Sequence, residues 1–490
     1  MALNIIIASP EAKPFSKTGG LADVAGSLPG ALKRLGVNVS LFLPLHRATR
    51  EAGFALEATG VKVRVPAGKR TIISEVFKSA YSGVPVYFPK CDEYFDRTYL
   101  YGTPEGDYFD NLERFAFFSR WTVECAKALH LKPDLIHSND WQTGLVAAYL
   151  KDAHREDKYL SRTATLFTIH NIAYQGLFEG DLFEVLGLKG SVTAHPGLEF
   201  WGKINLLKAG IVYSDVITTV SRGYSLEIQT PEYGYGLEGL LKERGGDLYG
   251  VLNGVDYGEW DPQEDELIPA RYSPDDLKGK RVCKEALLRE FGLEIKPTTP
   301  LIGMISRLAD QKGFDILSEA IPEIMRLDAG MIILGHGDKR YQDLVLKLKN
   351  RYPKKLSVRI AFDNRLAHLV EAGSDIFLMP SRYEPCGLNQ IYSLRYGTIP
   401  VVRATGGLDD TIKDYKEENG NGFKFREYSP AALAGKVREA VKLFEDNASW
   451  ERLQRKGMKE DYSWEGPAKR YIELYQLAMK RLPLKDKHRH

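Results

Sequence analysis

Short runs of apolar residues, each bounded by polar or turn residues, recur along the chain and predict buried strands. The runs are too short for helices, and their continuity suits strands of a parallel sheet that is covered on both faces. Amphipathic helical patterns lie between them, so strand and helix alternate. This alternation predicts an α/β fold built on doubly wound parallel sheets. The predicted strands are residues 3–8, 37–43, 135–138, 165–169, 301–305, 331–335, 358–361, 376–379 and 399–403, with inserted strands between 61 and 89.

Three helices are predicted from their helical patterns. The first predicted helix begins at Leu21 and carries Val24, Leu28 and Leu32 on one apolar face. Pro29 lies inside this pattern, and because proline lacks an N–H and crowds the preceding turn, it predicts a kink or a break. A second long helix is predicted over residues 107–130 and an amphipathic one over residues 463–479.

The alternation of predicted strands and helices is interrupted between two parts of the chain. Acidic, proline-bearing sequence at residues 260–276 is typical of a surface connection between domains. A chain of 490 residues is also too long for one ordinary core. We therefore predict two Rossmann-like domains, residues 1–247 and 248–462.

Composition narrows the range of functions. With 67 basic and 65 acidic residues the net charge is only +2, so no basic face is expected to bind nucleic acid. The four cysteines form no CxxC pair, which predicts neither disulfides nor a metal site and favours a cytoplasmic location. The first apolar run breaks at Pro10, which indicates a strand and not a signal peptide. No later segment approaches the ~20 apolar residues of a membrane span.

Residues 375–397 combine a buried strand, a polar loop and a helix. Gly387 permits a sharp turn into the helix, whose first amides would favour an anion or a sugar oxygen. Glu384 lies in the loop at the carboxyl end of the strand, where open α/β sheets bind ligands. A plain acid in the first helical turn is the alternative, since the helix dipole also favours it. The candidate residues here are Glu384, Cys386, Gly387 and Leu388.

Similar loops follow two strands of the first predicted domain. Lys17 precedes Gly19 and Gly20, which allow the backbone to approach a ligand at a helix start, although such a glycine pair can be an ordinary turn. Asp140 follows strand 135–138 and His170 follows strand 165–169. Helix capping for Asp140 and a structural role for His170 are the alternatives.

Two loops of the second predicted domain repeat the arrangement. Arg307 and Lys312 flank a loop that leads into a helix at Gly313, and two cations beside a helix start suit a diphosphate. Solvated surface cations are the alternative. Thr405, Gly406 and Gly407 again place glycines before a helix at the end of strand 399–403.

Three of these segments resemble blocks of one known family. They are KTGGLADV at 17–24, HNIAYQG at 170–176 and SRYEPCGLNQ at 381–390. They are similar to blocks of the bacterial glycogen synthase and plant starch synthase family, which are retaining glucosyltransferases. The resemblance covers essentially the whole chain, in family order. It implies the GT-B architecture, in which two Rossmann-like domains face a central cleft, and a C-terminal helix at 463–485 that crosses back onto the first, acceptor-side domain.

The resemblance implies transfer of glucose from ADP-glucose to the non-reducing 4-hydroxyl of an α-1,4-glucan, with retention of configuration. It assigns Glu384 to the developing positive charge of the transferred glucose and His170 to the same sugar. Lys17, Arg307 and Lys312 would hold the diphosphate, so no metal or cofactor is expected. The expected catalytic residues are Glu384, His170, Lys312 and Arg307, and the expected substrate-binding residues are Lys17, Gly19, Gly20, Asp23, Tyr101, Asp140, Asn253, Phe362, Cys386, Gly387, Leu388, Thr405, Gly406 and Gly407.

Two positions refine this expectation. Phe362 follows strand 358–361, where the family commonly has a tyrosine that stacks on adenine; a place in the core is the alternative. Related transferases often carry a second glutamate eight residues after the first, and this chain has Tyr392 there. That residue disfavours double displacement and favours front-face attack, in which the leaving phosphate takes the acceptor's proton.

Other functions on the same fold remain open from the sequence. They are a glucan synthase that uses UDP-glucose, a non-catalytic glucan-binding protein, and a nucleotide-sugar epimerase or glucan phosphorylase. The phosphorylase would need a pyridoxal-phosphate lysine site, which is not recognisable here, and a non-catalytic protein would be expected to lose Glu384, Lys17 or Lys312. The sequence makes no prediction of oligomeric state.

Overall fold

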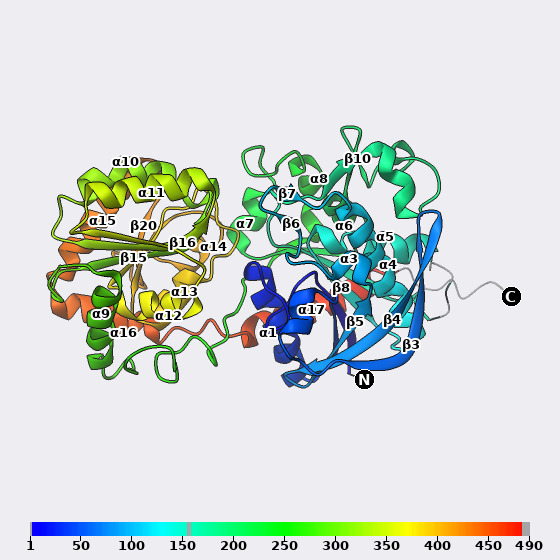
Figure 1. Cartoon of the computed structure of the whole chain (residues 1–490), viewed down its shortest axis with the longest axis horizontal. Helices are drawn as coiled ribbons and strands as arrows, with labels where there is room; N and C mark the ends of the chain where they lie inside the picture. Colours follow the sequence, from blue (N-terminus) through cyan, green and yellow to red (C-terminus); the bar gives the residue numbers. More distant parts are fainter. Residues whose placement is uncertain (1, 154–156, 158, 483–490) are drawn as a thin grey trace. The chain divides into compact units, whose positions relative to one another are not determined.

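The computed structural model describes residues 2–153, 157 and 159–482 (Figure 1). The chain forms two compact units. The first unit comprises Met1–Val220, Ser225–Gly254 and Trp464–His490, and the second comprises Ser221–Tyr224 and Val255–Ser463. Each unit is an α/β structure with its own sheet.

The first unit is built on a nine-stranded sheet among the described residues, in the order β14-β13-β9-β8-β1-β2-β5-β4-β3. Neighbouring strands from β14 to β5 are parallel, and β4 and β3 extend the sheet as antiparallel hairpins. The strands are β1 (Asn4–Ala8), β2 (Asn38–Phe42), β3 (Glu57–Ala67), β4 (Arg70–Tyr81), β5 (Val84–Lys90), β8 (Leu135–Asn139), β9 (Ala164–Ile169), β13 (Val216–Thr219) and β14 (Leu248–Gly250).

Helices cover both faces of this sheet because successive side chains of a strand point to opposite faces. Leu41 of β2 packs in the core with α1 and α17. Its neighbour Phe42 contacts Trp121 of α4, with ring centroids 5.3 Å apart. The helices of this unit are α1 (Gly20–Arg34), α2 (Arg47–Glu51), α3 (Asp92–Phe95), α4 (Asn111–Ala128), α5 (Val146–Ala153), α6 (Leu206–Tyr213), α8 (Glu238–Glu243) and α17 (Glu465–Lys480); α7 (Arg222–Glu227) begins in the second unit and ends in the first.

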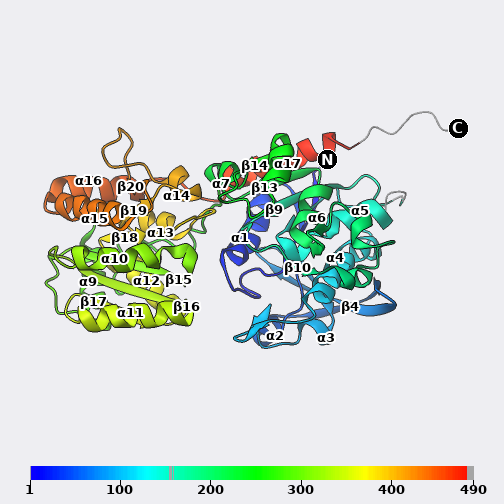
Figure 2. The same ribbon diagram turned by 90° about the horizontal axis from the view of Figure 1, so that it is seen from above.

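The second unit is built on a six-stranded parallel sheet in the order β17-β16-β15-β18-β19-β20, counted over the described residues. Figure 2 shows these strands from above, with β20 toward one edge and β16 and β17 toward the other. The strands are β15 (Leu301–Leu308), β16 (Gly330–Gly337), β17 (Leu356–Ile360), β18 (Ile376–Met379), β19 (Ile399–Arg403) and β20 (Phe423–Phe425).

Two apolar clusters, one on each face, hold helices against this second sheet. Ile376 and Leu378 contribute to one cluster and Phe377 to the other, as expected for alternating side chains. The sheet is therefore doubly wound. The helices are α9 (Lys278–Phe291), α10 (Phe314–Ile324), α11 (Lys339–Arg351), α12 (Asn364–Gly373), α13 (Asn389–Arg395), α14 (Gly406–Thr411), α15 (Pro430–Phe444) and α16 (Asn447–Met458).

Two small sheets complete the first unit. One contains β10 (Leu177–Glu179), β12 (Lys203–Asn205) and β11 (Glu199–Phe200), all antiparallel, and the other pairs β6 (Gly102–Thr103) with β7 (Gly106–Asp107). These strands have only two or three residues, so their side-chain alternation is too short to be recognised in the sequence.

Several predicted elements are confirmed, including the strands at 376–379 and 399–403. Of the predicted kink or break at Pro29, the break is wrong, because α1 runs unbroken from Gly20 to Arg34; the kink stays a prediction. Leu28 and Leu32, on either side of Pro29, are buried in the core, and this packing outweighs one missing backbone hydrogen bond.

The units change at Gly254, one strand beyond the boundary expected after residue 247. The reason is that β14 pairs with β13 and so completes the first sheet. The C-terminal α17 packs in the core of the first unit, where the Tyr475 hydroxyl lies 2.9 Å from Nδ1 of His137. The expected helix at 463–485 is seen as α17, and its part beyond residue 482 lies outside the described residues.

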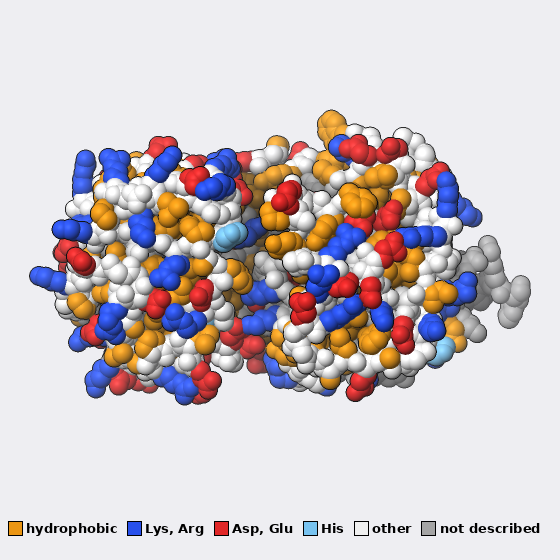
Figure 3. Space-filling view, viewed as in Figure 1, with side chains coloured by type: hydrophobic (Ala, Val, Ile, Leu, Met, Phe, Trp, Pro, Cys, Tyr) orange, Lys and Arg blue, Asp and Glu red, His pale blue; other side chains and the backbone are white. Residues whose placement is uncertain are grey.

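The surface carries both signs of charge. On the face shown in Figure 3, basic and acidic side chains are interspersed over each unit. All four cysteines are free and buried. Over the described ranges, no helix combines the length and the apolar character that a membrane crossing requires.

We expect Gly26→Ala to destabilise the first unit, although alanine is the better helix former by about 1 kcal/mol. A Cβ at position 26 would lie 2.3 Å from the carbonyl oxygen of Lys13. Because that oxygen belongs to backbone, the helix or the loop must move, and overpacking of this kind costs about 1–3 kcal/mol. A lower melting temperature in circular dichroism would show it.

Gly30→Ala, in the same helix, is the matched control. Its Cβ would lie 3.5 Å from the Cβ of Ser82, an ordinary contact. The melting temperature of this variant should be unchanged or higher. If both substitutions lowered the melting temperature equally, the close approach at Gly26 would not be the cause of the destabilisation.

Candidate active site

In the first unit, candidate residues gather at the carboxyl ends of β1, β8 and β9. These strands are adjacent and parallel, so the loops that follow them meet at one edge of the sheet. The backbone N–H of His170 donates to Oδ1 of Asp140 over 2.7 Å, and Nε2 of His170 lies 2.9 Å from Oδ1 of Asn139. The structure therefore joins Asp140 and His170 directly, and Asp140 makes no side-chain hydrogen bond that caps the helix after it.

Burial sets the charge states of these two residues. Desolvation lowers the pKa of His170 to about 3, so its imidazole is neutral at neutral pH. Desolvation raises the pKa of Asp140 to about 7, against the backbone N–H groups of His170 and Asn171, which lower it. Asp140 also has a φ of +56°, a conformation that non-glycine residues rarely adopt and that recurs at functional sites.

The loop between β1 and α1, which contains Lys17, lies at the same edge of the sheet. Nζ of Lys17 forms an ion pair with Oδ1 of Asp23 over 2.7 Å. Gly19 has an extended backbone with a φ of −159°, and a Cβ added there would meet nothing within 4 Å. Packing within the chain therefore does not require glycine at position 19. The open space beside this backbone leaves room for a ligand.

Glu11 is a buried residue of this loop that sequence reasoning missed. Its Oε2 accepts hydrogen bonds from the backbone N–H of Thr18, over 2.6 Å, and from the Thr18 hydroxyl, over 2.7 Å. Only 2% of Glu11 is exposed, and burial raises its pKa to about 7, with Asp23 and Asp140 adding to the effect. The signal in the sequence is an acid just after strand 3–8, at the same strand end as Lys17.

Tyr101 shares this electrostatic environment. Burial raises the pKa of its hydroxyl well above the usual value, and the charges of Glu11 and Asp140 raise it further. Its backbone carbonyl accepts a hydrogen bond from the side-chain amide of Asn111, at the start of α4. Tyr101 thus belongs with the residues at the carboxyl edge of the first sheet.

In the second unit, Lys312 and Glu384 form the central contact. Nζ of Lys312 lies 2.5 Å from Oε2 of Glu384, and the Ser381 hydroxyl donates to the same oxygen over 3.0 Å. Glu384 is 6% exposed. Because α13 begins only at Asn389, Glu384 is not an acid of the first helical turn. It is a loop carboxylate held by a cation.

Three glycines allow the backbone around Glu384 to pack closely. A Cβ on Gly313 would lie 2.1 Å from the carbonyl oxygen of Pro380, and one on Gly407 would lie 2.0 Å from that of Cys386. Gly387 has a φ of +69°, which favours glycine. The backbone N–H of Gly407 also donates to the carbonyl oxygen of Glu384 over 3.0 Å. The Glu384 loop is thus clamped between the Lys312 loop and the start of α14.

The remaining residues around this loop have defined places. Leu388 precedes α13 as its N-cap residue, and Thr405 does the same for α14. Gly406 opens α14 with a φ of +45°. The side-chain amide of Gln390 donates to the carbonyl oxygens of Cys386 and Gly387, both over 3.0 Å. These contacts fix the turn between β18 and α13.

Three further expected residues lie near the ends of other strands. Arg307 is exposed near the carboxyl end of β15, which runs to Leu308 and so extends beyond the predicted strand 301–305. Phe362 follows β17 and is 83% exposed, so it is not a core residue. Asn253 is buried after β14, and among the described residues its Oδ1 has no hydrogen-bond partner.

Tyr392 lies in an aromatic stack within the core of the second unit. Its ring is 4.1 Å from that of Trp260, at an interplanar angle of 6°, and Trp260 stacks in turn on His368 at 3.8 Å. Tyr392 is 7% exposed, so this position supplies core packing and no acid.

Comparison with known proteins gives the class of this fold and site. Residues 4–243 match the starch synthase catalytic domain family, and residues 289–457 match the glycosyl transferases group 1 family. The catalytic domain of starch synthase IV from Arabidopsis thaliana, bound to ADP and acarbose, is 31% identical, with a TM-score of 0.90 over 98% of this chain and 100% of that one. Sucrose-phosphate synthase from Thermosynechococcus elongatus shares the fold, with a TM-score of 0.60 at 14% identity over 98% and 99%. The chain is a glycosyltransferase with the GT-B fold.

Closer sequence relatives give the family. A glycogen synthase from Koribacter versatilis is 49% identical over 97% of this chain and 98% of its own length. The chain belongs to the glycogen synthase family.

The raised pKa of Glu11 predicts a pH-dependent stability. Below the ordinary value of 4.5, Glu11 is protonated in the folded and unfolded chain alike. Between 4.5 and about 7 the unfolded chain releases the proton and the folded chain keeps it, so the free energy of unfolding falls as pH rises through this window. The loss is on the order of 3 kcal/mol.

Glu11→Gln keeps an oxygen acceptor for Thr18 but does not titrate. Relative to the unmodified protein, its melting temperature should therefore rise as pH increases from about 5 to about 7.5. Thermal unfolding of both proteins across this range measures the difference. A difference that stays constant with pH would contradict the assignment of Glu11 as a carboxyl group buried at an energetic cost.

Proposed function

We propose that this glycosyltransferase transfers glucose from ADP-glucose to the non-reducing 4-hydroxyl of an α-1,4-glucan, with retention of configuration. The observation that carries the proposal is the buried Glu384 carboxylate held 2.5 Å from Lys312 at the carboxyl edge of the second sheet. The ADP and acarbose bound to the related starch synthase IV support a nucleotide donor and a glucan-like acceptor.

Glu384 acts on the transferred glucose. As the bond from C1 to the diphosphate oxygen breaks, C1 becomes electron-poor, and a nearby carboxylate stabilises that charge. Lys312 and Ser381 hold Oε2 of Glu384 in place, so little reorganisation is needed when the charge develops.

Cations offset the charge of the leaving diphosphate. Lys312 and the exposed Arg307 come from the β15 side of the second unit, and Lys17 comes from the first. Ammonium and guanidinium groups both bind phosphate oxygens by charge-assisted hydrogen bonds. With these groups in place, we assign no step to a metal ion or another cofactor.

His170 binds the glucose as a neutral hydrogen-bonding group. Its low pKa, about 3, means that it does not add positive charge beside the electron-poor C1. Asp140 accepts the backbone N–H of His170 and so fixes the position of the residue. His170 therefore positions the sugar and is not required as an acid.

The acceptor attacks from the face that the diphosphate leaves. The acceptor O4 forms a bond to C1, the bond from C1 to the phosphate oxygen breaks, and the acceptor proton passes to that phosphate oxygen. ADP then departs with the electron pair. Tyr392 packs against Trp260 where related transferases have a second glutamate, so this position offers no carboxylate for double displacement.

Adenine is the proposed base because Phe362 offers an exposed ring at the carboxyl end of β17, on the edge of the second sheet. A purine has a larger face than a pyrimidine for stacking on such a ring. Use of UDP-glucose is the competing donor assignment. The free, buried cysteines support the proposed cytoplasmic location.

Glu384→Gln should lower kcat by on the order of 100-fold or more, because the lost charge acts mainly in the transition state. Binding of ADP, measured by calorimetry, should be nearly unchanged. The assay is transfer from ADP-glucose to maltotriose.

Glu371→Gln is a matched control for this variant. Glu371 is a fully buried glutamate of the same unit, and burial raises its pKa to about 8, so the neutral amide resembles its usual state. This control should keep normal turnover. Normal turnover by Glu384→Gln itself would remove Glu384 from the mechanism.

Phe362→Ala should raise the KM for ADP-glucose by on the order of 10-fold, with little change in kcat. The stacking contact is the same in the ground state and the transition state, so its loss weakens both alike. Leu346→Ala, an exposed apolar residue on α11 of the same unit, should change neither constant.

The same assay compares the two donors. Equal or better use of UDP-glucose by the unmodified protein would overturn the adenine assignment. An unchanged KM for ADP-glucose in Phe362→Ala would contradict the assignment of Phe362 to the donor site. It would not contradict the proposed transferase reaction.

A further inference from the structure

Trp201 occupies a backbone position that disfavours it. It and Gly202 form the two-residue turn between β11 and β12, where Phe200 pairs with Lys203. Both turn residues have positive φ, +55° and +80°, the pattern of a type I′ turn. Such turns favour asparagine, aspartate or glycine at the first position, and a bulky residue there is unusual.

Packing does not explain this tryptophan. Trp201 is 84% exposed, so its ring contributes little to the core. It contacts Phe200 edge to face, with ring centroids 6.1 Å apart. A strained backbone that presents a large ring to solvent points to a binding role, since strain of this kind collects at ligand sites.

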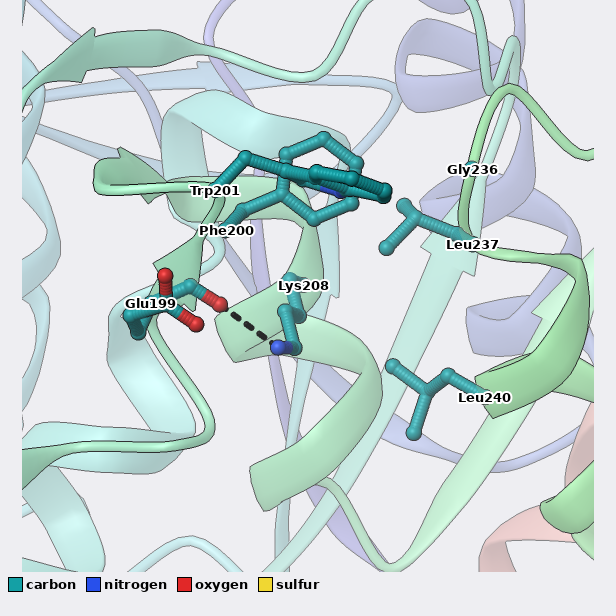
Figure 4. A pocket seen from close by; sticks show the side chains of 7 residues that line it. All are labelled: Glu199, Phe200, Trp201, Lys208, Gly236, Leu237 and Leu240. Carbon is teal, nitrogen blue, oxygen red and sulfur yellow. Dashed lines mark hydrogen bonds between the residues drawn. The ribbon is translucent and has the colours of Figure 1, made fainter. Parts of the chain in front are cut away.

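The Trp201 ring borders a pocket of about 400 Å³, which lies within the usual size range of small-molecule sites (Figure 4). Figure 4 shows the rings of Trp201 and Phe200 along one side and the side chains of Leu237 and Leu240 along another, with Lys208 between them. We call this site the Trp201 pocket. Its lining residues are Glu199, Phe200, Trp201, Lys208, Gly236, Leu237 and Leu240.

Hydrogen bonds hold the walls of the pocket in place. The buried amide of Asn205 donates to Gln175 over 2.6 Å, and Gln175 donates to the carbonyl oxygen of Tyr235 over 3.0 Å. A Cβ on Gly236 would lie 2.9 Å from the Phe200 ring, so this loop packs closely on the hairpin. A preformed wall lowers the entropy cost of binding.

The charges of the Trp201 pocket suit a neutral, hydroxyl-rich ligand. Its two charged lining residues are Glu199 and Lys208, so their formal charges cancel. The Lys208 ammonium already donates to the carbonyl oxygen of Glu199 over 2.6 Å, and the Glu199 carboxylate accepts the N–H of Gly202 over 2.8 Å. A phosphate group would find no cluster of cations, whereas a pyranose has an apolar face for the indole ring and hydroxyls for the two polar groups.

We propose that the Trp201 pocket binds a segment of the α-glucan acceptor and so holds the polymer on the first unit between transfers. The choice of glucan rests on the proposed function. None of the lining residues belongs to the candidate active site. For a long acceptor, a second point of attachment raises the effective concentration of chain ends without changing the chemical step.

The test uses Trp201→Asn, Trp201→Phe and the full-length protein. Asparagine suits the turn, so Trp201→Asn should fold with an equal or higher melting temperature while losing the ring. Its dissociation constant for glycogen, measured by affinity electrophoresis, and its KM for glycogen should rise on the order of 5-fold or more. Trp201→Phe should show a smaller effect.

Short acceptors separate the pocket from the active site. Maltotriose occupies one site at a time, so the kcat and KM of Trp201→Asn with maltotriose should equal those of the unmodified protein. Ile73→Ala, an exposed apolar residue on β4 outside the pocket, should leave every constant unchanged.

Two results would overturn the proposal. One is unchanged glycogen binding in Trp201→Asn, and the other is an equal loss of activity with glycogen and maltotriose. If unchanged glycogen binding is accompanied by an altered oligomeric state in light scattering, the ring is assigned to contact with a second copy of the chain. Electrophoretic binding needs no turnover, so a failure of the unmodified protein to use ADP-glucose would be recognised separately.

Discussion

The position of the Glu384 loop depends on two glycines. At each of them a neighbouring backbone segment lies so close that a Cβ atom would not fit. Gly313 and Gly407 lie against the carbonyl oxygens of Pro380 and Cys386, where an added Cβ would come within 2.1 Å and 2.0 Å. These contacts bring the loops that follow β15, β18 and β19 into one cluster. The 2.5 Å contact between Lys312 and Glu384 follows from that clustering, because each side chain is carried by one of the clamped loops.

The buried acidic side chains of the two units have different surroundings. In the first unit, desolvation leaves His170 neutral and raises the pKa values of Asp140 and Glu11 to about 7. In the second unit, Glu384 is nearly as buried but has the Lys312 ammonium beside it. In the proposed reaction, a neutral hydrogen-bonding group would bind the sugar and a carboxylate held by a cation would stabilise the positive charge that develops on it.

The sequence predicts those features that depend on local pattern or on motifs. Strands such as β18 and β19 are buried on both faces, so their apolar runs are continuous and easily recognised. The loop positions of Glu384 and Lys312 in the second unit, and of His170 in the first, follow from strand ends, because each parallel sheet brings the ends of its own strands to one edge. Glu11 was missed because its role depends on Thr18, a contact that the loop creates after folding. The unbroken α1 was missed for a similar reason, since packing around Pro29 is not visible in helix propensity.

Position 392 shows how one substitution links the core to the mechanism. A glutamate there would have to replace a ring that stacks on Trp260 at 4.1 Å, and Trp260 itself stacks on His368. His368 in turn contacts the buried Asp265 over 2.8 Å, and Tyr396 donates to the same carboxylate over 2.6 Å. A second carboxylate would therefore enter an aromatic cluster that already holds one buried acid, with a desolvation cost and repulsion between like charges. In the proposed mechanism, the residue that disfavours double displacement is thus also one that packs α13, the helix after the Glu384 loop, into the core.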